Sequence, residues 1–152
     1  MPPKRALPSI EISFFAHATE DREKVFKAAK NLLTEEISND LTFRRNEVRG
    51  YFGNPIMIFK SEIQGEAKVK AFLERVSSRL GEAEKESLQR EIDRHLDAAR
   101  NLYLRFDKQA AYLNNVRFAQ SDPIHIRLRV STAHGSRGGV LETLQSVGLL
   151  PS

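Results

Sequence analysis

Hydrophobic and polar residues alternate along several short stretches of this chain. The clearest alternation lies between Ile124 and Val130, where apolar residues are separated by His125, Arg127 and Arg129. Successive side chains of a β-strand point to opposite faces, so a period of two predicts a strand with one buried and one polar face. The same pattern predicts further strands over residues 10–16, 41–51, 56–63 and 102–106.

Other segments repeat their apolar residues at intervals of three and four, which is typical of amphipathic helices. They predict a first helix soon after residue 18 and further helices over residues 65–81, 82–99 and 108–113. Thr19 is expected to be the N-cap of the first helix, with Glu20 and Asp21 in its first turn, where the helix dipole favours acidic side chains. Gly65 and Gly81 are expected to open and close the second helix.

The predicted elements divide the chain into a central domain and two flanking segments. Residues 1–9 contain three prolines and are expected to form a flexible tail. Residues 10–130 are expected to form one α+β domain, a two-layer sandwich whose mostly antiparallel or mixed sheet has helices packed on one face. Residues 131–152 are expected to be a C-terminal extension with a short helix over 136–147, ended by Gly148.

Composition is that of an ordinary globular chain and removes several classes of site. Of the 152 residues, 40% are hydrophobic and 29% are charged, which favours a folded chain over a disordered one. The sequence has no cysteine, which excludes disulfides, thiolate nucleophiles and cysteine-ligated metals. Because no apolar run approaches the ~20 residues of a membrane helix and the first residues do not resemble a signal peptide, we expect a cytoplasmic protein with no membrane partner.

The net charge of +4 is distributed unevenly. The positive excess lies before residue 61 and after residue 100, mostly in predicted strands, whereas the mostly helical middle of the chain is slightly acidic. If helices cover one face of the sheet, the positive potential belongs to the strand side, as in nucleic-acid-binding proteins. A modest positive charge also aids solubility, and charge alone leaves both interpretations open.

Three motifs carry a resemblance to a known family. They are FAHATED at residues 15–21, GYFGNPI at residues 50–56 and RFDKQAAYL at residues 105–113. The motifs and their order resemble an archaeal family of RNA-binding-domain proteins described as predicted exosome subunits, and the likeness covers residues 10–130. The resemblance implies a compact two-layer α/β fold related to that of the large-subunit ribosomal protein that binds 5S rRNA.

Polar residues on three predicted strands form the first candidate RNA site. Arg127 and Arg129 lie opposite the apolar residues of their strand. Tyr103 and Arg105 have the same relation to their own strand, as Phe15 has to the first one. Guanidinium groups neutralise phosphates and aromatic rings stack on bases, which is how single-stranded RNA is bound. Each residue alone is better explained as an ordinary outward residue, but for the set the resemblance favours RNA.

The predicted hairpin is the second candidate site. Its Gly-Asn-Pro turn is explained by structure alone, because these residues supply positive φ angles and rigidity. Aromatic and basic residues interleave beside the turn, however, and could grip an RNA backbone and stack on a base. The candidate RNA-binding residues here are Arg44, Arg45, Arg49, Tyr51, Phe52 and Asn54.

The third candidate site follows the strand at residues 102–106. Asp107 is expected to cap a short helix. Lys108, together with Arg105, is a candidate phosphate contact, and Gln109 is a candidate reader of a base edge or ribose hydroxyl. The structural alternative is a surface lysine that pairs locally, an arrangement worth about 0–1 kcal/mol. The resemblance favours the RNA contacts.

Catalytic and metal chemistry have weaker support. His17, Thr19, Glu20 and Asp21 could suggest catalysis or a metal site, but Thr19 is explained by capping and the two acids by the helix dipole. His95, His125 and His134 show no pairing with acids at the spacing of metal ligands. Glu20, Asp21 and Asp107 could be assembled for two-metal RNA cleavage, but nothing in their spacing requires it. We therefore predict no catalytic residue, no metal site and no cofactor.

These observations predict an RNA-binding protein that is not an enzyme. The resemblance implies an accessory factor in RNA processing or degradation, associated with an exosome, or a part of ribosome-related machinery. Two alternatives stay open: a protein-interaction module whose partner is an exosome or ribonuclease subunit, and a metal-dependent ribonuclease. The sequence does not fix the oligomeric state, and a homodimer is compatible with it.

Overall fold

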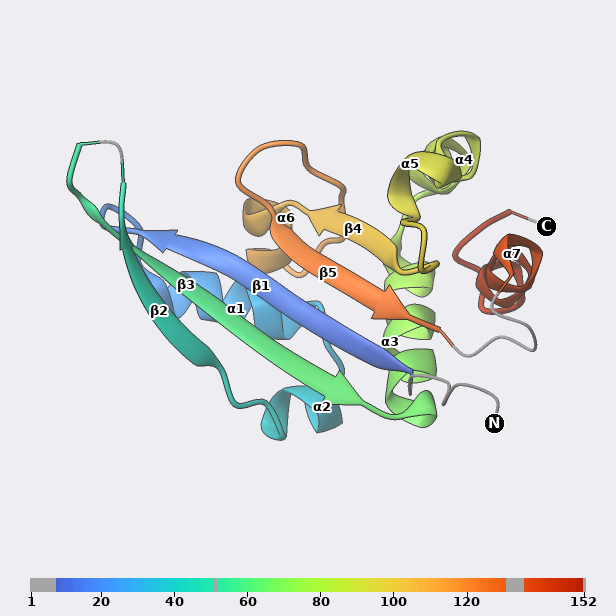
Figure 1. Cartoon of the computed structure of the whole chain (residues 1–152), viewed down its shortest axis with the longest axis horizontal. Helices are drawn as coiled ribbons and strands as arrows, with labels where there is room; N and C mark the ends of the chain where they lie inside the picture. Colours follow the sequence, from blue (N-terminus) through green and yellow to red (C-terminus); the bar gives the residue numbers. More distant parts are fainter. Residues whose placement is uncertain (1–7, 51, 131–135, 152) are drawn as a thin grey trace.

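The computed structural model describes residues 8–50, 52–130 and 136–151. Within these residues lies an antiparallel sheet with the strand order β2–β3–β1–β5–β4 (Figure 1). The strands are β1 (Ser9–His17), β2 (Arg44–Arg49), β3 (Pro55–Gln64), β4 (Leu102–Phe106) and β5 (Ile124–Arg129). β2 and β3 form the predicted hairpin, and β2 and β4 are the two edges of the sheet.

Helices lie behind one face of the sheet and beside its β4 edge (Figure 1). The helices are α1 (Arg22–Asn31), α2 (Glu35–Asn39), α3 (Glu66–Arg79), α4 (Glu82–Arg90), α5 (Ile92–His95), α6 (Lys108–Tyr112) and α7 (Arg137–Ser146). This arrangement confirms the predicted α+β fold with an antiparallel sheet. No helix in the described part of the chain has the length and apolar character needed to span a membrane.

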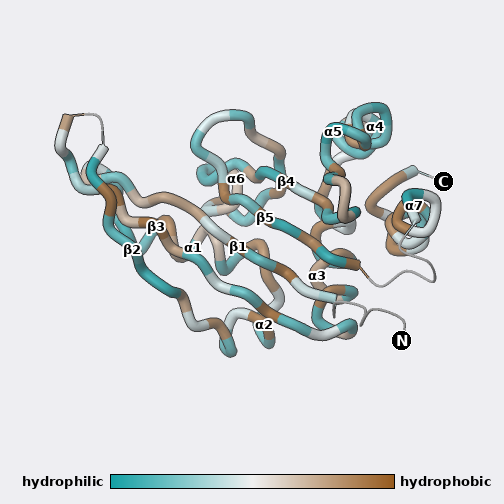
Figure 2. Tube along the Cα trace, viewed as in Figure 1, coloured by the Kyte–Doolittle hydropathy of each residue, from teal (hydrophilic) through white to brown (hydrophobic). Residues whose placement is uncertain are grey.

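The alternation along the strands sends one set of side chains into the core. In β1, Ile10, Ile12 and Phe14 are fully buried, and the apolar residues of β4 and β5 are buried in the same way. They form one core with the apolar stripes of α1 and α3, and Figure 2 shows the polar positions interleaved with the apolar ones. The opposite side of the sheet, which we call the open face, is not covered by any described helix.

Phenylalanine rings consolidate the core beneath β1 and β3. The ring of Phe26 in α1 lies 4.5 Å from that of Phe59 and 5.2 Å from that of Phe43, measured between centroids. Phe14 stacks on Phe59 at 5.4 Å. Offset and edge-on aromatic pairs add to the free energy gained by burial, so this cluster joins α1 firmly to the sheet.

The N-terminus of α1 differs from the prediction. The helix is capped by Asp21, whose Oδ1 accepts a hydrogen bond from the Glu23 N–H at 3.0 Å, and the prediction of Thr19 as N-cap is wrong. Glu20 lies before the helix, where its Oε1 accepts from the His17 N–H at 3.0 Å. The chain therefore turns tightly between β1 and α1 before the helix begins.

The helix predicted over residues 82–99 is also interrupted. It breaks at Glu91 into α4 and α5. α5 ends at His95, because Leu96 pairs with Leu102 at the sheet edge and cannot continue a helix there. Gly81 begins α4 instead of closing α3, which ends at Arg79. α2 was not predicted, and the strand predicted over 41–51 is confined to β2.

The C-terminal helix α7 belongs to the main core. Ser136 caps it, with its hydroxyl accepting a hydrogen bond from the Gly139 N–H at 3.0 Å. Val140 and Leu144 of α7 are buried in the same cluster as the sheet residues, together with Leu149 and Leu150. α7 is therefore packed against the helix layer.

Removing the central ring of the phenylalanine cluster should destabilise the protein. Phe59 is fully buried, so Phe59→Ala is expected to lower the free energy of unfolding by about 3–5 kcal/mol through lost burial and a cavity. Leu113→Ala is the control, since Leu113 is 58% exposed and its truncation should cost no more than about 0.5 kcal/mol. Urea unfolding of both variants measures this, and equal losses would contradict the assignment of Phe59 to the core.

Candidate nucleic-acid interface

The register of the sheet places basic side chains in one line across the open face. Ser13 of β1 lies opposite Lys60 of β3 on one side and His125 of β5 on the other. Arg44 of β2 continues the line beyond Lys60, and Arg105 of β4 continues it beyond His125. We call these residues the basic row: Arg44, Lys60, Ser13, His125 and Arg105. Neighbouring strands lie ~4.8 Å apart, so the row crosses roughly 19 Å of sheet.

Aromatic rings lie on both sides of the basic row. Phe15 follows Ser13 by two residues in β1, and Tyr103 precedes Arg105 by two residues in β4, so all four share the open face. Phe15 is 40% exposed and Tyr103 is 41% exposed, which leaves part of each ring accessible. Both rings line a shallow hollow of about 410 Å³ together with residues of the basic row. The hollow thus combines cations with surfaces for stacking.

One carboxylate moderates the positive charge of the open face. Glu11 Oε2 lies 2.9 Å from Arg127 Nη2, and its Oε1 lies 3.7 Å from Lys60 Nζ. Among the described residues, no ion pair or hydrogen bond engages the side chains of Arg44 and Arg105, at the two ends of the basic row. The ends of the row are therefore its least compensated cations.

Tyr103 is held in place by Asp97. The tyrosine hydroxyl donates to Asp97 Oδ2 at 3.0 Å, and this bond raises the pKa of Tyr103. Partial burial acts to raise the pKa of Asp97, but hydrogen bonds from the Asn101 N–H and side chain and from Tyr103 outweigh it, so the pKa is lowered overall. The carboxylate stays ionised and fixes the ring over the open face.

His125 occupies the middle of the basic row without adding a full charge. Its burial and the neighbouring Arg105 lower the pKa of the imidazole, against a smaller opposing effect of Asp122. The side chain is therefore neutral near pH 7, where it can offer one hydrogen-bond donor and one acceptor.

The other arginines predicted to bind RNA do not all lie on the open face. Arg129 shares the open face, where its Nε donates to Asn101 Oδ1 at 3.3 Å. Arg45 and Arg49 of β2 face the opposite way from Arg44, as the alternation of the strand requires. The guanidinium of Arg45 lies 5.8 Å from the centroid of the Phe59 ring, and Arg49 Nη1 donates to the Gly53 carbonyl at 3.5 Å.

The tip of the hairpin projects beyond the sheet (Figure 1). Phe52 is 88% exposed there. The Asn54 carbonyl accepts from the Gly50 N–H at 2.8 Å, and Gly53 has a φ of 78°, as predicted for the turn. The predicted positive φ of Asn54 is wrong, since the described residues with a positive φ do not include Asn54. Tyr51 lies outside the described residues.

The structure separates Lys108 and Gln109 from the open face. Lys108 Nζ donates to the Phe15 carbonyl at 2.7 Å and contacts Glu20 at 3.2 Å and Asp122 at 2.9 Å. Its side chain is only 13% exposed. A lysine has three donors, and all three are directed at protein oxygens here, as in the local pairing considered as the structural alternative. The phosphate contact of Lys108 stays a prediction. Gln109 lines a separate hollow between α1 and α6.

The acidic residues considered for metal chemistry are engaged in the same region. His17 Nε2 lies 3.2 Å from Asp122 Oδ1 and 3.8 Å from Glu20 Oε1, so these groups could hold a cation. The ammonium of Lys108 already contacts both carboxylates and supplies positive charge from within the chain. Asp107 caps α6 through its bond from the Ala110 N–H at 2.8 Å.

Lys60 and His125 belong to the basic row although the sequence analysis did not select them. Their strands were predicted, and the alternation of each strand places them on its polar side. The signal that would have found them is the register between β3, β1 and β5, which joins residues far apart in sequence.

A family model described as RNA binding matches residues 9–130 of this chain. The chain belongs to this RNA-binding family. The matched residues include every strand of the sheet and leave α7 outside.

Relatives and solved structures agree with this assignment. The RNA-binding protein PAB1135 of Pyrococcus abyssi is 37% identical over 139 residues, which cover 90% of each chain. The crystal structure of AF2318 from Archaeoglobus fulgidus is similar with a TM-score of 0.76 and 28% identity, covering 93% of this chain and 99% of that one. Mth689 of Methanothermobacter thermautotrophicus, a DUF54 protein, is similar with a TM-score of 0.75 and 25% identity, covering 92% and 96%. These findings confirm the resemblance to an archaeal RNA-binding-domain family.

Removing the Lys108 ammonium should destabilise the protein. Lys108→Met keeps the apolar stem but leaves Glu20 and Asp122 without their cation, so we expect a loss of about 1–3 kcal/mol in urea unfolding. Lys70→Met is the matched control, because Lys70 pairs with Glu74 at 3.9 Å in a solvent-exposed position. The control should change stability by less than about 0.5 kcal/mol. A Lys108→Met protein as stable as the control would contradict the structural role.

The lowered pKa of His125 predicts a pH dependence of stability. Above pH ~7 the imidazole is neutral in both the folded and the unfolded chain and contributes nothing. As the pH falls below the unfolded pKa, the unfolded chain binds the proton more readily, so the free energy of unfolding decreases. Between pH 7.5 and pH 5.5, the free energy of unfolding of His125→Gln should decrease less than that of the wild type. Urea unfolding of both proteins at several pH values across this range measures the difference. Identical pH profiles would refute it.

Proposed function

We propose that this protein binds single-stranded RNA across the open face of its sheet. The observation that carries the proposal is the basic row, which crosses every strand of the sheet between two partly exposed aromatic rings. The family description and the name of the relative PAB1135 support the same function.

The chemistry of the open face favours a single strand over a duplex. Arg44, Lys60 and Arg105 would neutralise phosphates, which releases condensed counterions and drives association. Phe15 and Tyr103 would stack on bases, and only unpaired bases expose their faces to side chains in this way. Arg127 is already paired with Glu11, so it would position the strand more than it would attract it.

The proposed role is that of an accessory factor without catalysis of its own. Such a protein would present RNA to an exosome or another processing machine, or act in ribosome-related machinery, in the cytoplasm. Copurification of the tagged protein with its complexes from cells tests this role. Cleavage of labelled RNA by the protein with magnesium or manganese would favour a ribonuclease instead, and affinity for a purified exosome subunit without affinity for RNA would favour a protein-interaction module.

Removing the two uncompensated ends of the basic row should weaken RNA binding. The logarithm of the association constant decreases linearly with the logarithm of the salt concentration. For the double variant Arg44→Ala/Arg105→Ala this negative slope should become shallower by about 1.4. The double variant Lys30→Ala/Arg90→Ala removes two exposed charges from the helix layer and is the matched control. Filter binding of a labelled single-stranded RNA over a range of salt concentrations measures both slopes.

Stability has to be compared as well, since a partly unfolded variant would also bind weakly. Neither Arg44 nor Arg105 pairs with another described side chain, so both double variants should unfold within about 0.5 kcal/mol of the wild type per substitution. An unchanged affinity and salt slope in Arg44→Ala/Arg105→Ala would show that RNA does not follow the basic row.

A further inference from the structure

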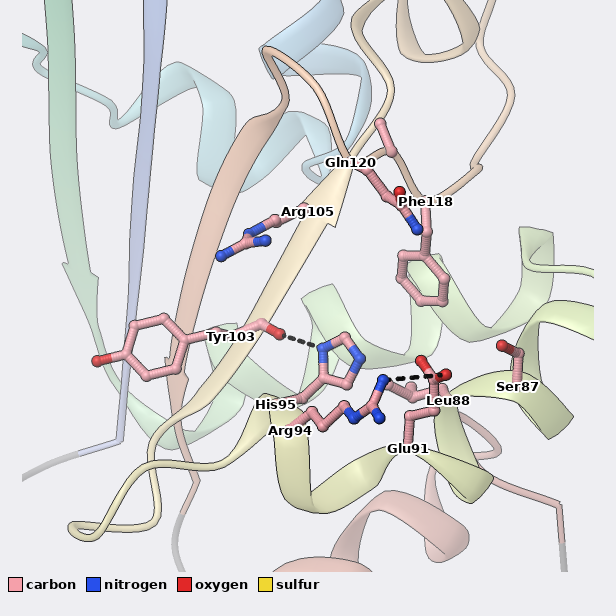
Figure 3. A pocket seen from close by; sticks show the side chains of 10 residues that line it. Ser87, Leu88, Glu91, Arg94, His95, Tyr103, Arg105, Phe118 and Gln120 are labelled. Carbon is pink, nitrogen blue, oxygen red and sulfur yellow. Dashed lines mark hydrogen bonds and ion pairs between the residues drawn. The ribbon is translucent and has the colours of Figure 1, made fainter.

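A second hollow, of about 590 Å³, lies beside the β4 edge of the sheet (Figure 3). It is enclosed by β4, by α4 and α5, and by residues 118–120, and we call it the edge pocket. Tyr103 and Arg105 line both the edge pocket and the hollow on the open face. A ligand that follows the basic row to its Arg105 end therefore arrives directly at the edge pocket.

Two short backbone pairings set the length of the edge pocket. Leu96 pairs with Leu102 at one end of β4, and Phe118 pairs with Phe106 at the other. The paired positions are four residues apart along β4, which corresponds to ~13 Å of strand. The pocket occupies the interval in which the outer edge of β4 is free of a neighbouring strand in the described chain.

Backbone groups of β4 face the edge pocket. The Tyr103 carbonyl lies 2.9 Å from His95 Nδ1, and the Arg105 carbonyl accepts from the Ala119 N–H at 3.0 Å. The N–H and carbonyl of one residue in an antiparallel strand point to the same side, so the Arg105 N–H also points this way. Within the described residues no hydrogen bond from that N–H is found, which leaves a donor for a ligand.

Two rings are fixed at the edge pocket (Figure 3). Phe118 packs on Phe106 at 5.4 Å between centroids, and its N–H donates to Glu84 Oε2 at 2.9 Å. His95 Nδ1 faces a carbonyl oxygen and must carry the hydrogen, so Nε2 is the nitrogen available to a ligand. Both rings are thus held by the protein before any ligand arrives.

Polar side chains complete the lining of the edge pocket. Gln120 and Ser87 offer neutral donors and acceptors, and Glu91 offers a carboxylate. Arg94 lies 3.7 Å from Glu91 in an exposed ion pair and brings a cation to the rim. A base needs stacking surfaces and partners for its edge, and a phosphate needs a cation. All of these groups meet in this one hollow, whose volume is in the usual range for small-molecule sites.

We propose that the edge pocket holds one unpaired nucleotide of the RNA that crosses the open face. The base lies against Phe118 and His95, and its phosphate lies near Arg94 and Arg105. Glu91 accepts hydrogen bonds, and adenine, cytosine and guanine each have an exocyclic amino group that donates one, whereas uracil offers only its ring N3–H. Bases with an amino group are therefore favoured over uracil. This inference rests on the proposed function and adds to it a site for one base.

Mononucleotides test whether the edge pocket binds a nucleotide independently of the open face. Adenosine monophosphate, added to the full-length protein, should shift the NMR signals of the Phe118 and His95 rings, and uridine monophosphate should shift them less. Inorganic phosphate is the probe for charge alone. Equal shifts with phosphate would overturn recognition of a base, and shifts only with a glutamate-rich peptide would assign the pocket to a protein partner.

Variants connect the pocket to RNA binding. Phe118→Leu keeps an apolar group on Phe106 but removes the stacking surface, so an adenine-rich single-stranded RNA should bind about fivefold or more weakly. Tyr112→Leu is the matched control, because Tyr112 lies between α1 and α6 at the separate hollow. Its affinity for the RNA should equal that of the wild type. Thermal unfolding of both variants separates lost stacking from lost structure.

The outcomes distinguish the two proposals. If Phe118→Leu binds RNA as tightly as the wild type and mononucleotides do not shift the ring signals, the nucleotide site in the edge pocket is overturned. The proposed function then still stands. Absence of RNA binding would overturn the proposed function. In that case, ring shifts with adenosine monophosphate would still support a nucleotide site, and their absence would overturn both proposals.

Discussion

The open face depends on the register between β1 and its two neighbours. Ser13 pairs with Lys60 and with His125 in the same row, and the residues on either side of it in β1 are buried. A slip of one residue would bring Ile12 or Phe14 to the surface and send basic groups into the core. The hydrophobic effect that seals the helix side therefore also aligns the charges on the other side, and the basic row is a by-product of core packing.

Much of the fold follows from local patterns in the sequence. The alternation over 124–130 and the apolar stripe of α3 predicted their elements, and the outward direction of Arg105 and Tyr103 followed from the same period. The exceptions have different causes. Thr19 is not the N-cap of α1 because Asp21, two residues further along the chain, caps the helix. The contacts of Lys108 with Glu20 and Asp122 span 88 and 14 positions of sequence, and no local pattern predicts them. Sequence periodicity gives a residue its face, whereas its partners come from tertiary structure.

Glu11 has two consequences for the open face. It lies within reach of both Lys60 and Arg127, which lowers the net charge at the centre of the row. The same contacts restrict two long side chains, and restraint before binding reduces the entropy lost when a ligand arrives. Uncompensated cations at the ends of the basic row and restrained side chains in its middle suit a surface that binds a nucleic-acid backbone without recognising every base.

Because α7 is buried in the core, the folding unit extends beyond the residues that match the family model. The match ends at residue 130, yet Val140, Leu144 and Leu149 fill the core beside α3, and Arg137 reaches Asp93 of α5 at 2.6 Å. A fragment cut at residue 130 would keep every strand but leave apolar side chains of α3 facing water. Such a truncated chain would tend to aggregate, so expression boundaries for this protein are better taken from the core than from the segment that matches the family model.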